Sequence, residues 1–529
     1  MSAEPILRLI DNPVGIAQAR RSLRGGWAAQ GLLTVGLVLA FGLIRASVSA
    51  ADVISWTVAR DACLAAIGAV LCLQGTARVS AATAHDRRNG LIDFHRTTPT
   101  SAWTDALGYV AGCALRGYVS ALLLAPIFVL ASLLAGGSLL HALTALYLVV
   151  ATGLLCQVYG AFVGLASGRE RAAAVALGSL SGLVVLASSA PALHLTALRH
   201  LTPLPALQSL GFLDLARSAA HSFTFFGIRC TPVTFTLLFQ GYLLVYVSWA
   251  TARRLRRERA PAFTRRGALV FFAIGTAFFL APAWARLGQP ESAAATTGLY
   301  LLLAVLGAGL LALSLVPSLL CGLREIRRAR RLGCRTGWRS EGASSWTLVP
   351  CFALLIVAGL AMILGRAEAA GGALPGTMTS PEVAFALIGC SIAVSLLFGT
   401  VEYSRLVPNH RLLLIGFACL VLPWFLGTGA SMLLSDSTLT RYLLATSPLH
   451  SLLDAVDALV RHMGGRPQVV DTGQWCWSLL VAGGSAVALW WAVLRARAGM
   501  VAEEAAAGDL PSIDGYRDAS RARSGTIGA

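Results

Sequence analysis

Long apolar runs dominate this chain of 529 residues and decide what it can fold into. A helix needs about 20 consecutive apolar residues to cross the hydrocarbon core of a bilayer. Only 13% of the residues are charged, about half the share found in soluble globular proteins. The sequence therefore predicts an all-α polytopic membrane protein with about twelve transmembrane helices. The runs cover approximately residues 27–44, 56–77, 110–136, 141–166, 173–191, 231–251, 267–285, 297–321, 347–365, 383–400, 412–433 and 475–494.

Arginine carries all the basic charge of the chain, because none of the 42 basic residues is a lysine. If the N-terminus is cytoplasmic, 31 arginines fall in cytoplasmic segments, 9 fall outside and 2 fall within the runs. Cytoplasmic loops of membrane proteins carry an excess of positive residues. We therefore expect an integral protein of the inner membrane with both termini in the cytoplasm. The net charge of +17 then marks topology and contact with anionic lipids of the bilayer, and it does not indicate a nucleic-acid partner.

The missing lysine also excludes two kinds of chemistry. A Walker A loop needs a lysine on the nucleotide phosphates, and Schiff-base catalysis needs a lysine amine. The chain has no H-E-x-x-H or G-x-S-x-G motif, and its cysteines form no C-x-x-C pair. We therefore expect no catalytic residue, no metal site and no cofactor in this chain. If ATP drives it, ATP and Mg²⁺ are bound by a partner.

The runs fall into two sets of six, joined by a basic loop at 252–266. A similar outer segment precedes the last run of each set, at 201–207 and at 446–452. Internal repeats of this kind are common in transporters. The expected parts are a six-helix unit at 1–255, a second, degenerate six-helix unit at 256–500, and a disordered cytoplasmic tail at 501–529. The longer outer stretches 192–229 and 434–474 are each expected to form a short broken helix at the membrane surface.

The connection between the second and third runs, at 80–106, carries the most information. It begins with charged residues, and Gly90 then permits a sharp turn. A short amphipathic stretch follows, and Thr98 and Pro99 end it. We expect a rigid helix-turn-helix element at the membrane surface, which can transmit a push from a soluble partner.

This connection resembles the first cytoplasmic loop of ABC-2 type transporter permeases. That family typically shows an acidic-basic pair, a G-T-L-D core, apolar residues and a T-P step. The matching residues here are Asp86 and Arg87 for the pair, Gly90, Ile92 and Asp93 for the core, and Thr98 and Pro99 for the step. Leu91, His95 and Arg96 depart from the pattern. The resemblance covers residues 8–255, including an amphipathic N-terminal helix that begins near Asn12.

The resemblance implies the permease subunit of an ATP-driven exporter that works with a separate dimeric ATPase. In such a subunit the matching residues of the loop would contact the ATPase. The second inner loop would add a smaller contact through Arg169 and Glu170. The second half would complete an internal pseudo-dimer, or the chain would form a homodimer. The ordinary alternative for Asp86, Arg87 and Asp93 is a solvated loop beside a topology-setting arginine cluster.

A proton-coupled secondary transporter of the major-facilitator type is the alternative function. Twelve helices, two halves and a basic central loop suit that class, and residues 86–90 partly match its D-R-x-G loop motif. However, about 17 residues follow Gly90 before the next run, whereas the loop of that class is short.

Two smaller patterns concern the membrane interior. Gly160, Gly164 and Gly168 share one helix face, which predicts close helix packing. Arg60 and Asp61 lie inside the second run, where charges are usually paired or face the bundle interior. A simple effect of the helix end is the alternative for this pair.

Overall fold

The structure is a computed structural model, and it describes the following residues of the chain. These are residues 12–24, 36, 52–97, 100–167, 171–189, 196–213, 223–257, 261–315, 345–371, 380–406, 459 and 472–506. Within these ranges, nine helices are long and apolar enough to cross a membrane, which confirms an all-α polytopic membrane protein. A tenth apolar helix, Ala172–Val185, is shorter. The predicted run 412–433 lies outside the described residues, as does the run 27–44 apart from residue 36, so the count of twelve stays a prediction.

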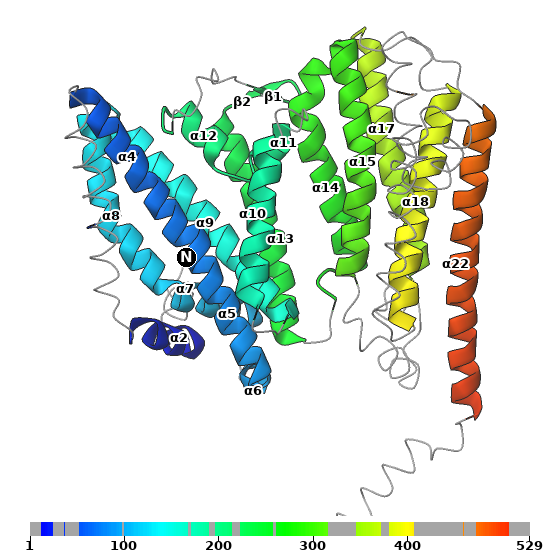
Figure 1. Cartoon of the computed structure of the whole chain (residues 1–529), viewed down its shortest axis with the longest axis horizontal. Helices are drawn as coiled ribbons and strands as arrows, with labels where there is room; N and C mark the ends of the chain where they lie inside the picture. Colours follow the sequence, from blue (N-terminus) through cyan, green and yellow to red (C-terminus); the bar gives the residue numbers. More distant parts are fainter. Residues whose placement is uncertain are drawn as a thin grey trace, which may run out of the picture. The chain divides into compact units, whose positions relative to one another are not determined.

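The elements follow the apolar runs closely (Figure 1). In chain order they are α2 (Pro13–Leu23), α4 (Asp52–Gly68), η1 (Ala69–Gln74), α5 (Gly75–Arg88), α6 (Leu91–Thr97), α7 (Ala102–Cys113), α8 (Leu115–Leu134), α9 (Leu139–Ser167), α10 (Ala172–Ser189), α11 (Thr196–Arg199), α12 (Leu204–Ser209), β1 (Phe223–Phe225), β2 (Ile228–Cys230), α13 (Pro232–Arg256), α14 (Arg265–Ala283), η2 (Trp284–Gly288), α15 (Pro290–Ser314), η3 (Ser345–Leu348), α17 (Val349–Ala369), α18 (Pro381–Leu406) and α22 (Thr472–Ala506). The antiparallel hairpin β1–β2 is an addition that the sequence did not predict.

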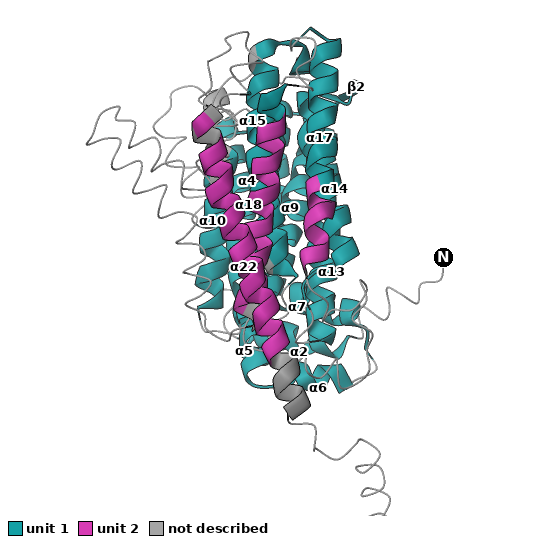
Figure 2. Ribbon diagram, turned by 90° about the vertical axis from the view of Figure 1, so that its right-hand side faces the viewer, with its two compact units in different colours: residues 1–317, 354–383, 456–468 teal, residues 318–353, 384–455, 469–529 magenta. Residues whose placement is uncertain are grey.

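The chain divides into two compact units (Figure 2). Unit 1 comprises Met1–Pro317, Leu354–Val383 and Val456–Gln468, and unit 2 comprises Ser318–Ala353, Ala384–Ala455 and Val469–Ala529. The boundary at residue 255 and the duplication of a six-helix unit stay predictions.

Unit 1 is built around the crossing of α5 and α9. A Cβ atom on Gly160 would lie 2.7 Å from the carbonyl oxygen of Thr76, and one on Gly164 would lie 2.5 Å from that of Ser80. The two backbones therefore meet directly, which confirms the close packing predicted for these glycines. Gly168 lies outside the described residues.

A π-helical turn, η1, lies between α4 and α5 beside this crossing. The turn widens the helix, and its Leu71 carbonyl accepts an additional hydrogen bond from Gln157 Nε2 on α9 at 3.1 Å. The Tyr118 hydroxyl on α8 donates to Gln157 Oε1 at 2.5 Å. One buried amide therefore ties three helices together inside the apolar bundle.

The first outer stretch holds two short helices, α11 and α12, and returns into the core. Arg60 on α4 pairs with Asp61 at 2.9 Å and donates to the Gly211 carbonyl at 3.0 Å, while the Leu213 amide donates to Asp61. Phe212, which lies between Gly211 and Leu213 in the sequence, is buried against Phe128, with 5.6 Å between ring centroids. The charged pair therefore holds the end of this outer segment. The second outer stretch lies outside the described residues, apart from Leu459.

Unit 2 contains most of α18 together with α22. The Trp490 indole donates to Ser395 Oγ at 2.9 Å, and Arg497 forms an ion pair with the buried carboxylate of Glu402. Both contacts join α18 to α22, so this pair of helices is fixed by polar as well as apolar groups.

Candidate functional site

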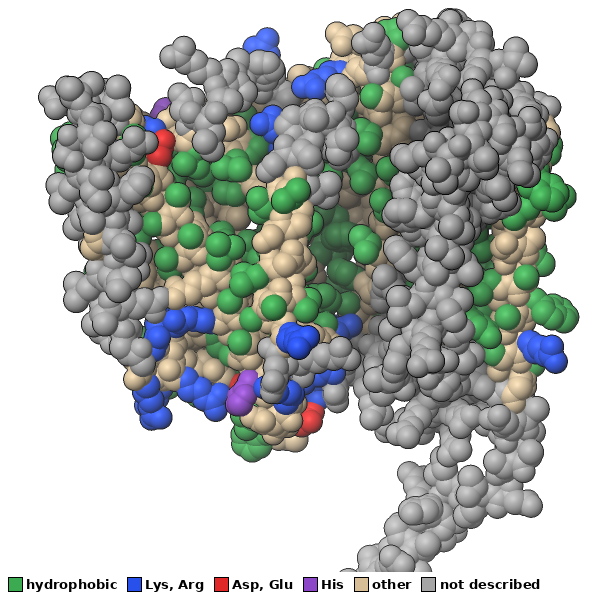
Figure 3. Space-filling model, in the orientation of Figure 1, with side chains coloured by type: hydrophobic (Ala, Val, Ile, Leu, Met, Phe, Trp, Pro, Cys, Tyr) green, Lys and Arg blue, Asp and Glu red, His purple; other side chains and the backbone are tan. Residues whose placement is uncertain are grey.

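The predicted contact element forms one end of unit 1, where α2, α6 and the ends of α5 and α7 gather (Figure 1). Arginine side chains cover much of this end, as the space-filling view shows (Figure 3). The element is a true helix-turn-helix, because α5 ends at Arg88 and α6 begins at Leu91.

Asp86, the acidic member of the predicted pair, lies inside the fold with 1% of its surface exposed. Its carboxylate accepts hydrogen bonds from Gln18 Nε2 at 2.6 Å, from Arg21 at 3.1 Å and from the Tyr109 hydroxyl at 2.9 Å. A buried carboxylate is costly unless its oxygens are hydrogen-bonded, and here three donors serve them. Asp86 therefore joins α5 to α2 and α7, and it does not face the surface.

Tyr109 is fully buried in this network. Burial and the neighbouring carboxylate of Asp86 raise the pKa of Tyr109 above its usual value. The phenol therefore stays neutral and remains a hydrogen-bond donor at physiological pH.

The N-terminal helix α2 fits against α7 through glycines. Asn12 caps α2 by accepting from the Val14 amide at 3.0 Å, and its side-chain amide donates to the Thr104 carbonyl at 2.6 Å. A Cβ on Gly112 would lie 2.6 Å from the carbonyl oxygen of Gly15. Only glycine at position 112 permits this approach, so α2 lies directly on the backbone of α7.

The turn between α5 and α6 depends on Gly90, whose φ of +71° is a conformation that side chains disfavour. The Gly90 carbonyl then accepts the first hydrogen bond of α6, from the Asp93 amide at 3.1 Å. Ile92 points into the core formed with Val14 and Tyr109, and 2% of its surface is exposed. The turn and this apolar anchor fix the direction of α6.

Two arginines connect the element to the ends of long helices. Arg87 donates to the carbonyls of Leu165 and Ala166, the latter at 3.1 Å, at the end of α9. Arg96 donates through Nε to the Leu255 carbonyl at 2.8 Å, at the end of α13. The last carbonyls of a helix lack partners within it, so cations are favoured there. Both arginines therefore act as C-terminal caps.

The outer face of α6 carries Asp93 and Phe94. Phe94 exposes 66% of its surface, and Asp93 is ion-paired with Arg96 on the same helix. An exposed aromatic ring beside a carboxylate is a surface suited to a protein partner. This face of α6 is therefore one exposed part of the loop that a partner could reach.

The structure shows what each described residue of the predicted contact set touches, and the predicted contact with an ATPase stays a prediction. Gly90, Ile92 and Asp93 shape and present α6, whereas Asp86 and Arg87 bind other helices. Thr98, Pro99, Arg169 and Glu170 lie outside the described residues, and their predicted roles stay predictions.

Several residues of the site were missed by sequence reasoning, namely Gln18, Arg21, Phe94, Arg96 and Tyr109. Gln18 and Arg21 share one face of α2 at a spacing of three, which is a usable signal. Arg96 was noted only as a departure from the family pattern. Within the described parts of the chain, no group of three His, Cys, Asp or Glu residues could hold a metal ion.

Comparison with models of known protein families, with curated proteins and with solved structures finds no match to this chain. The assignment of a function therefore depends on the geometry described above and on the resemblance of its loop.

Proposed function

We propose that this chain is the transmembrane permease subunit of an ATP-driven ABC exporter. It works with a separate dimeric ATPase, and it lies in the inner membrane with both termini cytoplasmic. ATP and Mg²⁺ are bound by the ATPase, and the chain itself makes and breaks no covalent bond. One observation carries the proposal: α6 is an exposed helix that is firmly connected to the transmembrane bundle.

The connections of α6 support this role because each leads to a different helix. Arg96 joins α6 to the end of α13. Ile92 packs against residues of α2 and α7. The Gly90 turn makes α6 continuous with α5, whose Asp86 is bound to the same two helices. A displacement of α6 would therefore be transmitted to α2, α5, α7 and α13 together.

This arrangement suits alternating access. Closure of an ATPase dimer would press on Asp93 and Phe94, and the element would move as a unit with α5 and α13. Packed helices respond to such a displacement by shifting between discrete arrangements. The substrate path would then open to one side of the membrane or the other, within an internal pseudo-dimer or a homodimer.

The test is purification of the chain in mild detergent, followed by mass spectrometry of the proteins that elute with it. We expect a P-loop ATPase to co-purify with the wild type. The double variant Asp93→Arg with Phe94→Asp should lose it, because the exposed face of α6 is changed without touching the core. Ile228→Asp is the matched control, since Ile228 is an exposed apolar residue of β2, at the other end of unit 1 in Figure 1.

Other outcomes contradict the proposal. Unchanged recovery of the ATPase with the double variant would remove α6 as the contact. A wild-type chain that purifies without an ATPase and transports in response to a proton gradient would establish the secondary transporter instead.

A further inference from the structure

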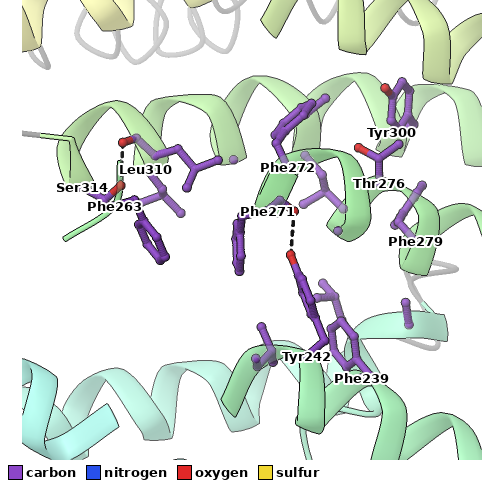
Figure 4. A pocket seen from close by; sticks show the side chains of 18 residues that line it. Phe239, Tyr242, Phe263, Phe271, Phe272, Thr276, Phe279, Tyr300, Leu310 and Ser314 are labelled. Atoms are coloured by element: carbon purple, nitrogen blue, oxygen red, sulfur yellow. Dashed lines mark hydrogen bonds between the residues drawn. The ribbon is translucent and has the colours of Figure 1, made fainter. Parts of the chain in front are cut away.

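A second feature of unit 1 lies away from the contact element, between α13, α14 and α15. It is a pocket with a volume of about 400 Å³ (Figure 4). Aromatic side chains from two helices form its walls, including Phe239 and Tyr242 on α13 and Phe271 and Phe279 on α14. Tyr242 and Phe271 stack with 5.1 Å between ring centroids.

The lining offers few polar groups to a ligand. None of the described residues that line the pocket is charged, and the hydroxyl groups of Tyr242, Tyr300 and Ser314 already donate to backbone carbonyls. Tyr242 donates to the Phe271 carbonyl at 2.6 Å, Ser314 donates to the Leu311 carbonyl at 2.7 Å, and Tyr300 lies 3.2 Å from the Ile356 carbonyl. A polar ligand would lose its hydration and gain few hydrogen bonds in return, so the pocket favours an apolar ligand.

The pocket is elongated along the helices. It is lined along α15 from Tyr300 to Ser314, a length of about 21 Å at the rise of an α-helix. Leu310 both lines it and exposes 68% of its surface, so the pocket opens sideways. A long, apolar, laterally open slot between membrane helices matches one extended acyl chain.

Positive charge gathers at one end of the slot. Phe263 and Ser314 line that end, and the Ala262 amide donates to the Ser314 carbonyl at 3.0 Å. Arg265 and Arg266 follow within the first turn of α14, which contains no acidic residue. The N-terminal end of a helix carries partial positive charge, which adds to the charge of the two arginines and favours an anionic group beside them.

We propose that this pocket binds one acyl chain of an anionic glycerophospholipid, with its phosphate beside Arg265 and Arg266. The length of the slot suits one acyl chain, and its lining is apolar. The arginines at one end suit an anionic headgroup, so the three features together indicate this class of lipid. The inference does not rest on the proposed transport function, because it concerns a lipid site on α13–α15 rather than the contact element.

Native mass spectrometry of the delipidated full-length protein tests the proposal. The probes are phosphatidylglycerol and phosphatidylcholine with identical acyl chains. We expect one molecule of phosphatidylglycerol to remain bound to the wild type, and phosphatidylcholine to bind more weakly. Equal binding of the two lipids would overturn the assignment of an anionic headgroup.

Gly307→Leu fills the slot, since a Cβ atom there would lie 3.7 Å from the Phe272 ring, an ordinary contact. Leu310→Trp is the second blocking variant, because its exposed position avoids disturbing the core. Both should lose the bound lipid. Gly365→Leu on α17 is the matched control, since a side chain there meets nothing within 4 Å. Lipid binding that survives both blocking variants, or that is lost equally in the control, would overturn the pocket as the site.

The double variant Arg265→Gln with Arg266→Gln tests the basic end. Each arginine near an anionic lipid contributes about fivefold in affinity, so we expect binding about 25-fold weaker. Arg495→Gln, at an exposed position of α22, should leave binding unchanged. Wild-type affinity in the double variant would overturn the proposed position of the phosphate.

Discussion

The Tyr109 hydroxyl donates a hydrogen bond of 2.9 Å to the buried carboxylate of Asp86. These residues lie on α7 and α5, and their contact closes the network that also holds α2. An acidic side chain in a loop at the end of a membrane bundle would ordinarily face water. Here it lies inside the fold, because three donors from two other helices replace water around it.

Asp86→Ala should destabilise the protein. The change leaves the Tyr109 hydroxyl and the Gln18 amide buried without their acceptor, and we expect a loss of about 3 kcal/mol. Thermal unfolding in detergent measures this. The control is Asp93→Ala, whose exposed ion pair should contribute about 0.5 kcal/mol or less. Equal losses from the two variants would contradict a structural role for Asp86.

Gly164→Leu should separate α9 from α5. A side chain at this position would collide with the Thr83 hydroxyl and with the Ser80 carbonyl oxygen, and the Ser80 backbone cannot move without shifting α5. We expect a loss of about 3 kcal/mol or failure to fold, measured by thermal unfolding and gel filtration. Gly178→Leu on α10 should be neutral, since a Cβ there meets nothing within 4 Å. A stable, monodisperse Gly164→Leu protein would show that the close crossing is not required.

Acid should destabilise the outer segment through His200. This side chain is buried, with its Nδ1 atom 2.7 Å from Thr236 Oγ1. Burial, with a smaller effect of Arg199, lowers the pKa of His200 to about 3, against about 6.5 in an unfolded chain. Above pH 6.5 the His200 side chain is neutral in both the folded and the unfolded state. As the pH falls below 6.5, the unfolded state takes up the proton first, so stability decreases.

At pH 5 this proton uptake costs about 2 kcal/mol. Thermal unfolding of the wild type and of His200→Gln at pH 7.5 and pH 5.0 measures the difference. The variant should lose less stability on acidification than the wild type does. If both lose the same amount, His200 is not the group responsible.

Arg96→Met should loosen α6 without unfolding the bundle. The change removes the hydrogen bonds to the end of α13 while keeping the aliphatic stem. We expect faster hydrogen exchange of the backbone amides of residues 91–97, because local opening then costs less free energy. Arg257→Met, at an exposed position just after α13, is the control and should leave that exchange unchanged. Unchanged exchange in Arg96→Met would mean that Ile92 and the Gly90 turn hold α6 by themselves.

Local features of the sequence predicted the helix-turn-helix element well. Gly90 marked the turn because its backbone conformation is local. The start of α7 is set by an equally local contact, in which the Ser101 hydroxyl accepts from the Thr104 amide at 3.1 Å. The roles of the charged residues were harder to predict. Asp86 and Arg87 are adjacent in sequence, yet one binds α2 and α7 while the other caps α9, and nothing local distinguishes them.

The membrane class and the approximate positions of the described membrane helices were determined by the sequence alone. Hydrophobicity summed over about 20 residues is a local property of the sequence. Exposing apolar surface to water, or charge to lipid, costs so much free energy that an apolar run of this length has few alternatives to a membrane-spanning helix. Only the tertiary structure decided which polar side chains meet. Gln18 and Asp86 are 68 residues apart, and Gly160 and Gly164 on α9 bring that helix against α5. The slot between α13, α14 and α15 also exists only when these three helices pack together. Such contacts depend on the shapes of several helices at once, which no single stretch of sequence contains.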